Sequence, residues 1–197
     1  MTTRVSGIVL AGGRSSRFGS DKLVAELDGR TLLDRAVQAV AAVATELIVV
    51  TAQGDERLLP AVGVPIRRVE DRESFGGPLV GLLGGLGMAR EPIVVVVAGD
   101  MPSIVPEVLG ALVEALVASP ASGAAALESD GGPVPLPAAF RTDAATDVAS
   151  RLVDDGERRL RAVFEHLPTR LLREAEWRPL DRDARTLRDV DVPGDLG

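Results

Sequence analysis

A short apolar strand that ends in glycines and cations constrains this chain more than any other feature. Residues 8–11 read Ile-Val-Leu-Ala, and Gly12 and Gly13 follow at once. The basic residues Arg17 and Lys22 come shortly afterwards. A continuous apolar run is typical of a strand that is buried on both faces of a parallel sheet. Glycines let the backbone turn closely around a ligand, and cations supply countercharge for phosphates. We therefore predict that this loop binds a nucleoside triphosphate.

A basic turn without any ligand is the alternative interpretation of the loop. The loop gathers glycines, serines and cations on a chain whose formal net charge is −7. This clustering favours an anion-binding site over a basic turn without a ligand. The spacing does not match the P-loop, because no Gly-x-x-x-x-Gly-Lys-Ser/Thr is present and Asp21 precedes the lysine. The dinucleotide-binding pattern Gly-x-Gly-x-x-Gly is also absent.

Predicted strands and helices alternate through the first half of the chain. The strands are expected at residues 47–50, 66–69 and 93–98, and the helices at 32–43, 79–88 and 106–117. Such alternation is typical of an α/β fold, in which a mostly parallel sheet carries helices on both faces. The length of 197 residues and the apolar content of 46% suit one Rossmann-like domain over residues 1–197.

The second half of the chain has a less regular pattern. Three prolines crowd the segment 133–140, and proline cannot donate to a sheet ladder, so any strand there is expected at a sheet edge. The other expected elements are strands at 124–127, 169–172 and 187–192, helices at 144–152 and 157–167, and a polar loop at 177–185.

Three polar residues, Thr51, Asp71 and Asp100, follow predicted strands. Ligands of such sheets bind outside the carboxyl ends of the strands, so we expect these residues close to the glycine loop. Asp100 is the candidate Mg²⁺ ligand, because Mg²⁺ takes one or two carboxylates together with substrate phosphates. Asp71 is suited to accept hydrogen bonds from guanine or ribose. The alternatives are a turn residue for Asp100 and an ordinary loop acid for Asp71.

Composition excludes several other classes of function. The acidic balance argues against a nucleic-acid partner. The chain has no cysteine and one histidine, which leaves little for thiolate metal sites or a serine–histidine mechanism. We expect no membrane association, because the apolar runs are far too short to span a bilayer. The N-terminus has no signal-peptide pattern, and the lack of cysteine fits a cytoplasmic location.

The glycine loop also matches a known signature. The pattern Leu-Ala-Gly-Gly-x-Ser-x-Arg-Phe-Gly-x-Asp-Lys occupies residues 10–22. Related stretches are Gly-Pro-Leu-Val-Gly at 77–81, Gly-Asp-Met-Pro at 99–102, Gly-Glu-Arg-Arg-Leu-Arg at 156–161 and Asp-Val-Pro-Gly-Asp-Leu at 191–196. On these residues the chain resembles the nucleotidyltransferases of molybdenum-cofactor biosynthesis. It is most similar to the guanylyl-transferring members, which carry Leu-Ala-Gly-Gly where the cytidylyl-transferring members tend to carry Leu-Ala-Ala-Gly.

The resemblance implies Mg²⁺-dependent transfer of GMP from GTP to molybdopterin, with release of pyrophosphate. The N-terminal half would bind the nucleotide and the C-terminal half the acceptor. Transient contact with molybdoenzymes or their chaperones is also implied. The implied catalytic residues are Lys22 and Asp100, with Asp100 holding the metal. Arg17 is a further expected catalytic residue, because its charge in the glycine loop suits it to bind the triphosphate. The implied nucleotide contacts are Leu10, Ala11, Gly12, Gly13, Lys22, Thr51, Asp71 and Asp100.

Two departures from the family pattern leave alternatives open. Thr51 stands where the family often has asparagine, and Asp189 and Asp191 replace a closing asparagine pair. One alternative is a related nucleotidyltransferase that uses CTP or a phosphorylated sugar or metabolite acceptor. The other is a nucleotide-binding module without catalysis, against which the presence of both Lys22 and Asp100 argues.

Overall fold

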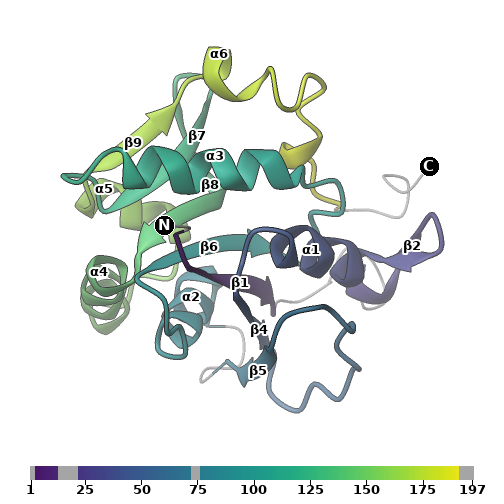
Figure 1. Ribbon diagram of the computed structural model, residues 1–197. Helices are drawn as coiled ribbons and strands as arrows, with labels where there is room; N and C mark the ends of the chain where they lie inside the picture. Colours follow the sequence, from purple (N-terminus) through teal and green to yellow (C-terminus); the bar gives the residue numbers. More distant parts are fainter. Residues whose placement is uncertain (1–2, 13–21, 72–75, 191–197) are drawn as a thin grey trace.

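A seven-stranded sheet forms the centre of the molecule, with the strand order β5-β4-β1-β6-β8-β7-β9 (Figure 1). The computed structural model describes residues 3–12, 22–71 and 76–190. The sheet strands are β1 (Val5–Ala11), β4 (Glu46–Thr51), β5 (Ile66–Glu70), β6 (Ile93–Ala98), β7 (Ala124–Ser129), β8 (Gly132–Arg141) and β9 (Thr169–Leu172). A separate hairpin joins β2 (Glu26–Leu27) to β3 (Arg30–Thr31). Within the sheet β8 alone runs against its neighbours, so the predicted mostly parallel α/β fold is confirmed.

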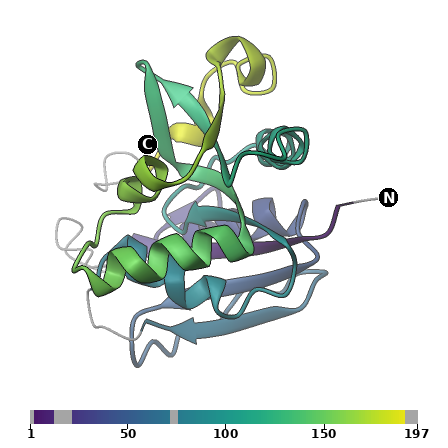
Figure 2. The same ribbon diagram turned by 90° about the vertical axis from the view of Figure 1, so that its left-hand side faces the viewer.

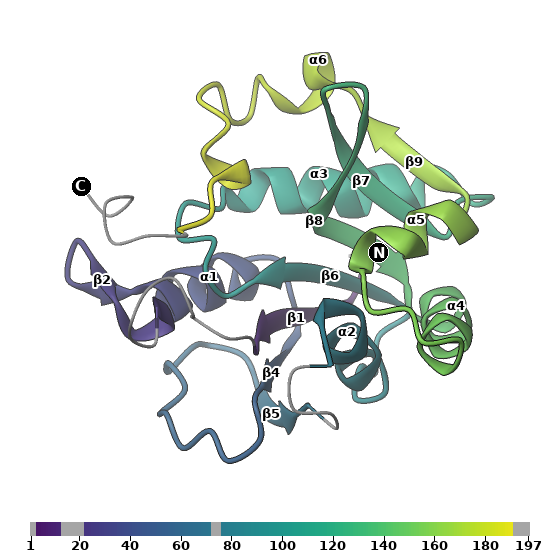
Figure 3. The same cartoon turned by 180° about the vertical axis from the view of Figure 1, so that it is seen from behind.

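Helices cover both faces of this sheet. α1 and α3 pack on the face seen in Figure 1, and α2, α4 and α5 pack on the face seen in Figure 3. The helices are α1 (Leu32–Ala41), α2 (Pro78–Leu86), α3 (Pro106–Val117), α4 (Thr142–Asp154), α5 (Val163–His166) and α6 (Glu174–Trp177). No helix in the described ranges is long and apolar enough to cross a membrane.

Strand alternation divides the core between the two faces. In β1, Val9 packs into the core under α1 and α3, whereas Ile8 and Leu10 pack into the core under α2 and α4. Both sets are buried, which explains why these strands read as continuous apolar runs. Because β1, β4, β5 and β6 are parallel, their carboxyl ends lie at one edge of the sheet.

The prediction that the proline-rich strand lies at an edge is wrong, because β8 lies between β6 and β7. Only the apolar end of β8 pairs with β6, and this pairing stops at Val96 and Ala138. The prolines at 133, 135 and 137 precede that point, where β8 pairs with β7 alone and the register shifts. Their missing N–H groups therefore do not interrupt a ladder with β6. In Figure 2 the turn between β7 and β8 stands clear of the rest of the sheet.

Two further elements differ from the predicted ones. The helix expected at 157–167 begins only with the short 3₁₀ helix η2 (Leu160–Ala162), because the Glu157 side chain accepts the backbone N–H groups of Arg158 and Arg159. The expected final strand is replaced, as far as residue 190, by the 3₁₀ helix η3 (Arg185–Leu187) and three residues without regular secondary structure. Residues 191–192 of that prediction lie outside the described residues.

The polar loop expected at 177–185 starts with a core residue. Trp177 ends α6 and is fully buried, and its indole N–H donates to the Glu128 carbonyl of β7 at 3.2 Å. A single tryptophan in a polar stretch carries no periodic signal, so the pattern of the sequence did not reveal this anchor.

Candidate functional site

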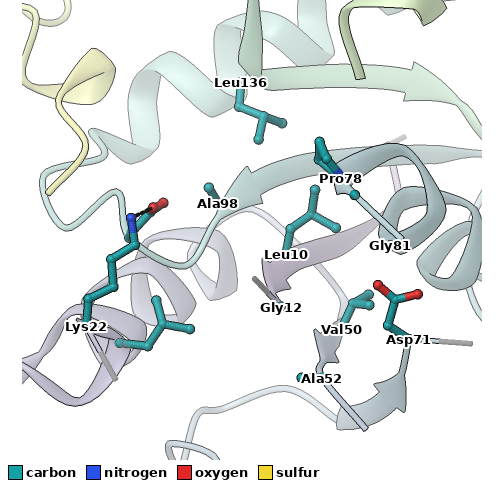
Figure 4. A pocket seen from close by; sticks show the side chains of 13 residues that line it. Leu10, Gly12, Lys22, Val50, Ala52, Asp71, Pro78, Gly81, Ala98 and Leu136 are labelled. Atoms are coloured by element: carbon teal, nitrogen blue, oxygen red, sulfur yellow. Dashed lines mark ion pairs between the residues drawn. The ribbon is translucent and has the colours of Figure 1, made fainter. Parts of the chain in front are cut away.

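A cavity of about 260 Å³ opens at the carboxyl edge of the parallel strands. Residues at or just beyond the ends of β1, β4, β5 and β6 line it: Leu10, Gly12, Val50, Ala52, Asp71 and Ala98. We call it the nucleotide-side cavity, because several predicted nucleotide contacts line it. Lys22 and Asp71 reach it from opposite sides, with Leu10 between them (Figure 4). The predicted convergence at one sheet edge is therefore present.

Lys22, Asp100 and Val190 form a closed triangle at one end of the nucleotide-side cavity. The Lys22 Nζ lies 2.5 Å from the Asp100 Oδ2 and also donates to the Val190 carbonyl at 3.2 Å. The Val190 N–H donates to the Asp100 carbonyl at 3.1 Å. Both charged side chains are about one-fifth exposed, so each remains accessible to a ligand. Lys22 is the single lysine among the 22 lysine and arginine residues of the chain.

The other predicted nucleotide contacts occupy different surroundings. Gly12 lines the cavity, and a Cβ there would lie 3.7 Å from the Ala52 backbone nitrogen, which is ordinary contact. Ala11 is buried and packs into the core under α1 and α3. Thr51 is also fully buried, and its hydroxyl has no hydrogen-bond partner within the described part of the chain. The neighbouring Ala52 lines the cavity instead. Predicted contacts at Gly13 and Arg17 lie outside the described residues.

A second cavity of about 660 Å³ adjoins the first. Asp100, Gly77 and Pro78 line both cavities, so the carboxylate and the first turn of α2 stand at their junction. Gly77 has a φ of +87°, and a Cβ there would lie 3.0 Å from the Arg158 carbonyl, so this position favours glycine on both counts.

Three arginines distinguish this second cavity, which we call the arginine-side cavity. Arg158 is held by hydrogen bonds to the Val153 and Glu157 carbonyls. Arg159 pairs with Glu157 at 2.6 Å, and hydrogen bonds from Arg159 and Arg158 lower the pKa of Glu157 to about 2. Arg161 is exposed and has no salt-bridge partner among the residues that the structure describes. Arg161 therefore lines the cavity as a cation without an ion pair to any described residue, which suits an anionic ligand.

Some lining residues were not predicted as site residues. Leu136 lines both cavities, yet it comes from the proline-rich strand β8. Asp189 lines the arginine-side cavity. The signal for the arginines was present in the stretch 156–161, which matches a family motif, but no local pattern indicates Leu136.

The donor set at the cavity junction fits a metal that is shared with a substrate. In the described part of the chain, no three acidic, histidine or cysteine side chains gather as a complete metal cage. Mg²⁺ needs no such cage, since one carboxylate together with phosphate oxygens and water satisfies it. Asp100 is such a carboxylate, and its Oδ2 already holds a cationic group.

Comparisons with known proteins agree with this geometry. Residues 7–171 match the model of the MobA-like NTP transferase domain. A probable molybdenum cofactor guanylyltransferase of Chloroflexus aggregans is 35% identical, over 98% of this chain and 91% of that protein. A molybdenum cofactor guanylyltransferase of Burkholderia vietnamiensis is also 35% identical, over 83% of each chain. The crystal structure of molybdopterin-guanine dinucleotide biosynthesis protein A from Archaeoglobus fulgidus superposes with a TM-score of 0.80 at 24% identity, covering 97% of this chain and 94% of that one.

Proposed function

From the premise that the chain belongs to the MobA-like NTP transferase family, we propose that it is a molybdenum cofactor guanylyltransferase. It transfers GMP from GTP to the terminal phosphate of molybdopterin and releases pyrophosphate. The relatives of 35% identity carry that activity in their names. The observation that carries the proposal is the Lys22–Asp100 pair at the junction of the two cavities.

The two cavities suggest how the substrates are divided. The nucleotide-side cavity takes GTP, with the base and ribose near Leu10, Gly12 and Asp71. The arginine-side cavity takes the acceptor, whose phosphate meets Arg161. The α-phosphate then lies beside Asp100, which is the point that both cavities share. This division agrees with a nucleotide-binding N-terminal half and an acceptor-binding C-terminal half.

The reaction needs no protein nucleophile. An oxygen of the acceptor phosphate attacks the α-phosphorus of GTP, one P–O bond forms, and the bond between the α-phosphorus and the bridging oxygen breaks. Lys22 stabilises the negative charge that grows on the α-phosphate and on the leaving pyrophosphate. Asp100 would hold a Mg²⁺ ion, which supplies further charge neutralisation when bound. Catalysis then consists of positioning and electrostatic stabilisation.

Pyrophosphate release tests the proposal directly. We expect release with GTP and molybdopterin together and little release with ATP, CTP or UTP. GTP with Mg²⁺ should raise the melting temperature more than CTP does, because a ligand that binds only the folded state stabilises it. Equal melting-temperature shifts with GTP and CTP would instead support a related transferase that uses CTP. Binding of GTP without any turnover would support a nucleotide-binding module.

Several finer expectations go with this function as proposals. They are a cytoplasmic location, transient contact with molybdoenzymes or their chaperones, and no association with nucleic acid or membranes. The net charge of −7 supports the expectation of no nucleic-acid partner, and the lack of cysteine supports the cytoplasmic location. The contact with molybdoenzymes or their chaperones rests on the family resemblance.

A further inference from the structure

The segment 181–190 lies along the loop that carries Asp100 and forms hydrogen bonds with it at two points. Thr186 accepts the Val105 N–H at 3.1 Å, just before α3 begins. Val190 bonds to the Asp100 carbonyl at the other end of the loop. Figures 1 and 3 both show this segment lying beside the connection from β6 to α3.

A buried polar group anchors the segment. Asp181 is 1% exposed, and its carboxylate accepts the N–H groups of Thr186 at 2.7 Å and of Arg185 at 3.0 Å. Burial would raise the pKa of Asp181, but these N–H groups and the Thr186 hydroxyl hold the pKa below its usual value of 3.8. The ionised carboxylate therefore accepts from the Thr186 hydroxyl, whose oxygen in turn accepts from Val105. Such a buried network has low tolerance for a missing member.

The anchor leads directly to the two candidate catalytic charges. Beyond Thr186 the chain reaches Val190, whose N–H and carbonyl contact Asp100 and Lys22 respectively. Lys22 has a long flexible stem, and holding its ammonium in one place costs side-chain entropy. A fixed carbonyl at Val190 reduces the freedom of that ammonium. A fixed N–H at Val190 likewise restrains the backbone of Asp100.

We propose that Asp181 and Thr186 are positioning residues, which act through Val190 to hold Lys22 and Asp100 at the junction of the two cavities. The assignment to a reaction rests on the proposed function, whereas the positioning itself is independent of it. The role differs from mere stabilisation of the fold, because it predicts a specific change at Lys22 when the hydroxyl of Thr186 is removed.

The single lysine of the chain makes this change measurable. An amine-acylating reagent can modify only Lys22 and the N-terminal amine, and cleavage after arginine separates the two sites because Lys22 falls in the peptide 18–30. Acylation consumes the accessible, deprotonated amine of Lys22, so its rate reports how firmly the bound ammonium group is held by its partners. Peptide mass spectrometry then gives the rate at Lys22 without GTP or acceptor being present.

Thr186→Val is the principal variant, since it keeps the shape of the side chain and removes the hydroxyl. We expect acylation of Lys22 to become about fivefold faster, in line with the loss of one hydrogen bond. Thr186→Ser restores the hydroxyl and should label like the wild type. Asp181→Asn, which also keeps the shape, should label like Thr186→Val and provides a second measurement if that variant does not fold.

A matched control separates positioning from stability. Val163→Ala removes volume from the core on the opposite face of the sheet, away from the segment 181–190. It should lower the melting temperature without changing the acylation rate of Lys22. Equal rates in Thr186→Val and the wild type, or an equal increase in Val163→Ala, would overturn the positioning role. If the rates change as expected but no variant and no wild-type protein transfers GMP, the proposed function fails and the positioning role stands.

Discussion

The Lys22 ammonium lies 2.5 Å from the Asp100 carboxylate, so the basic loop and the acidic strand end meet in one ion pair. Each group is also the one that the proposed reaction needs for a different partner. Lys22 must reach phosphate oxygens, and Asp100 must reach a cation. The pair therefore holds both groups at the cavity junction before substrates arrive. Binding of GTP with its metal would replace the Lys22–Asp100 ion pair by two contacts, one from Lys22 to phosphate and one from Asp100 to the metal.

Replacement of Lys22 by alanine should reduce catalysis strongly. We expect a loss of about 2–4 kcal/mol of transition-state stabilisation, typical of one preorganised electrostatic contact. The loss should appear in kcat as well as in KM, because the charge on the α-phosphate grows during the reaction. Arg30→Ala, at an exposed position of β3, should cost less than about 1 kcal/mol. Steady-state kinetics would check this. If Lys22→Ala lost no more kcat and KM performance than Arg30→Ala, Lys22 would have no catalytic role.

Asp100→Asn keeps the shape of the side chain and removes its charge. We expect turnover to fall by about 100-fold or more, because the amide would hold Mg²⁺ weakly and the negative charge that grows on the phosphates would lack the neutralising metal. The melting temperature should stay close to that of the wild type, and GTP binding should weaken mainly when Mg²⁺ is present. Glu114→Gln, on the exposed side of α3, is the control. Near-normal turnover of Asp100→Asn would show that the metal is held elsewhere.

Arg161→Ala tests the acceptor side of the site. The exposed guanidinium lines the arginine-side cavity, and its loss should raise the KM for molybdopterin by about tenfold, as expected for one charge-assisted hydrogen bond. The thermal shift caused by GTP should not change. Arg173→Ala, which is exposed and outside both cavities, should leave both quantities unchanged. A changed GTP shift with an unchanged acceptor KM would reverse the assignment of the cavities.

Glu46 should make the stability of the fold depend on pH at the edge opposite the site. Burial would raise the pKa of Glu46, but hydrogen bonds from Ser6 and the Arg90 backbone, together with Arg67, hold it below the usual 4.5. The stabilisation is therefore complete above pH 4.5 and is lost as the pH falls through the lower, folded value.

Glu46→Gln provides the measurement for this dependence. It should reduce the free energy of unfolding by about 3 kcal/mol at pH 7, because it leaves the Arg67 guanidinium without its buried partner. The difference from the wild type should shrink below pH 4.5, as followed by denaturant titration. A difference that is constant from pH 7 to pH 3 would contradict the role of the carboxylate charge.

Two helical glycines should respond to alanine in opposite directions. A Cβ at Gly85 of α2 would lie 2.8 Å from Ile8 and 3.2 Å from Val50, so the helix would have to move away from the sheet. We expect Gly85→Ala to destabilise the fold by about 1–3 kcal/mol. At Gly110 of α3 the added Cβ would have no atom within 4 Å among the described residues outside the helix's own backbone, and alanine should stabilise by about 0.5–1 kcal/mol through helix propensity. Thermal unfolding of both variants decides this.

Local pattern in the sequence determined the fold class and the edge where the site lies. The apolar runs of β1, β4 and β6 identify strands buried on both faces, because the central side chains on either face of such a strand pack into a hydrophobic core. Residues that follow parallel strands must meet at one edge, so the convergence of Gly12, Asp71 and Asp100 needed no knowledge of distant contacts.

Only the tertiary structure decided which distant groups touch. The triangle of Lys22, Asp100 and Val190, the place of β8 inside the sheet, and the burial of Trp177 all join segments that are far apart in the chain. The arginine-side cavity is likewise built from strand β8, the stretch after α4 and the segment near the C-terminus. The physical reason is that hydrophobic periodicity reports which face of an element is buried, whereas the partner across that face is selected by packing of the whole molecule.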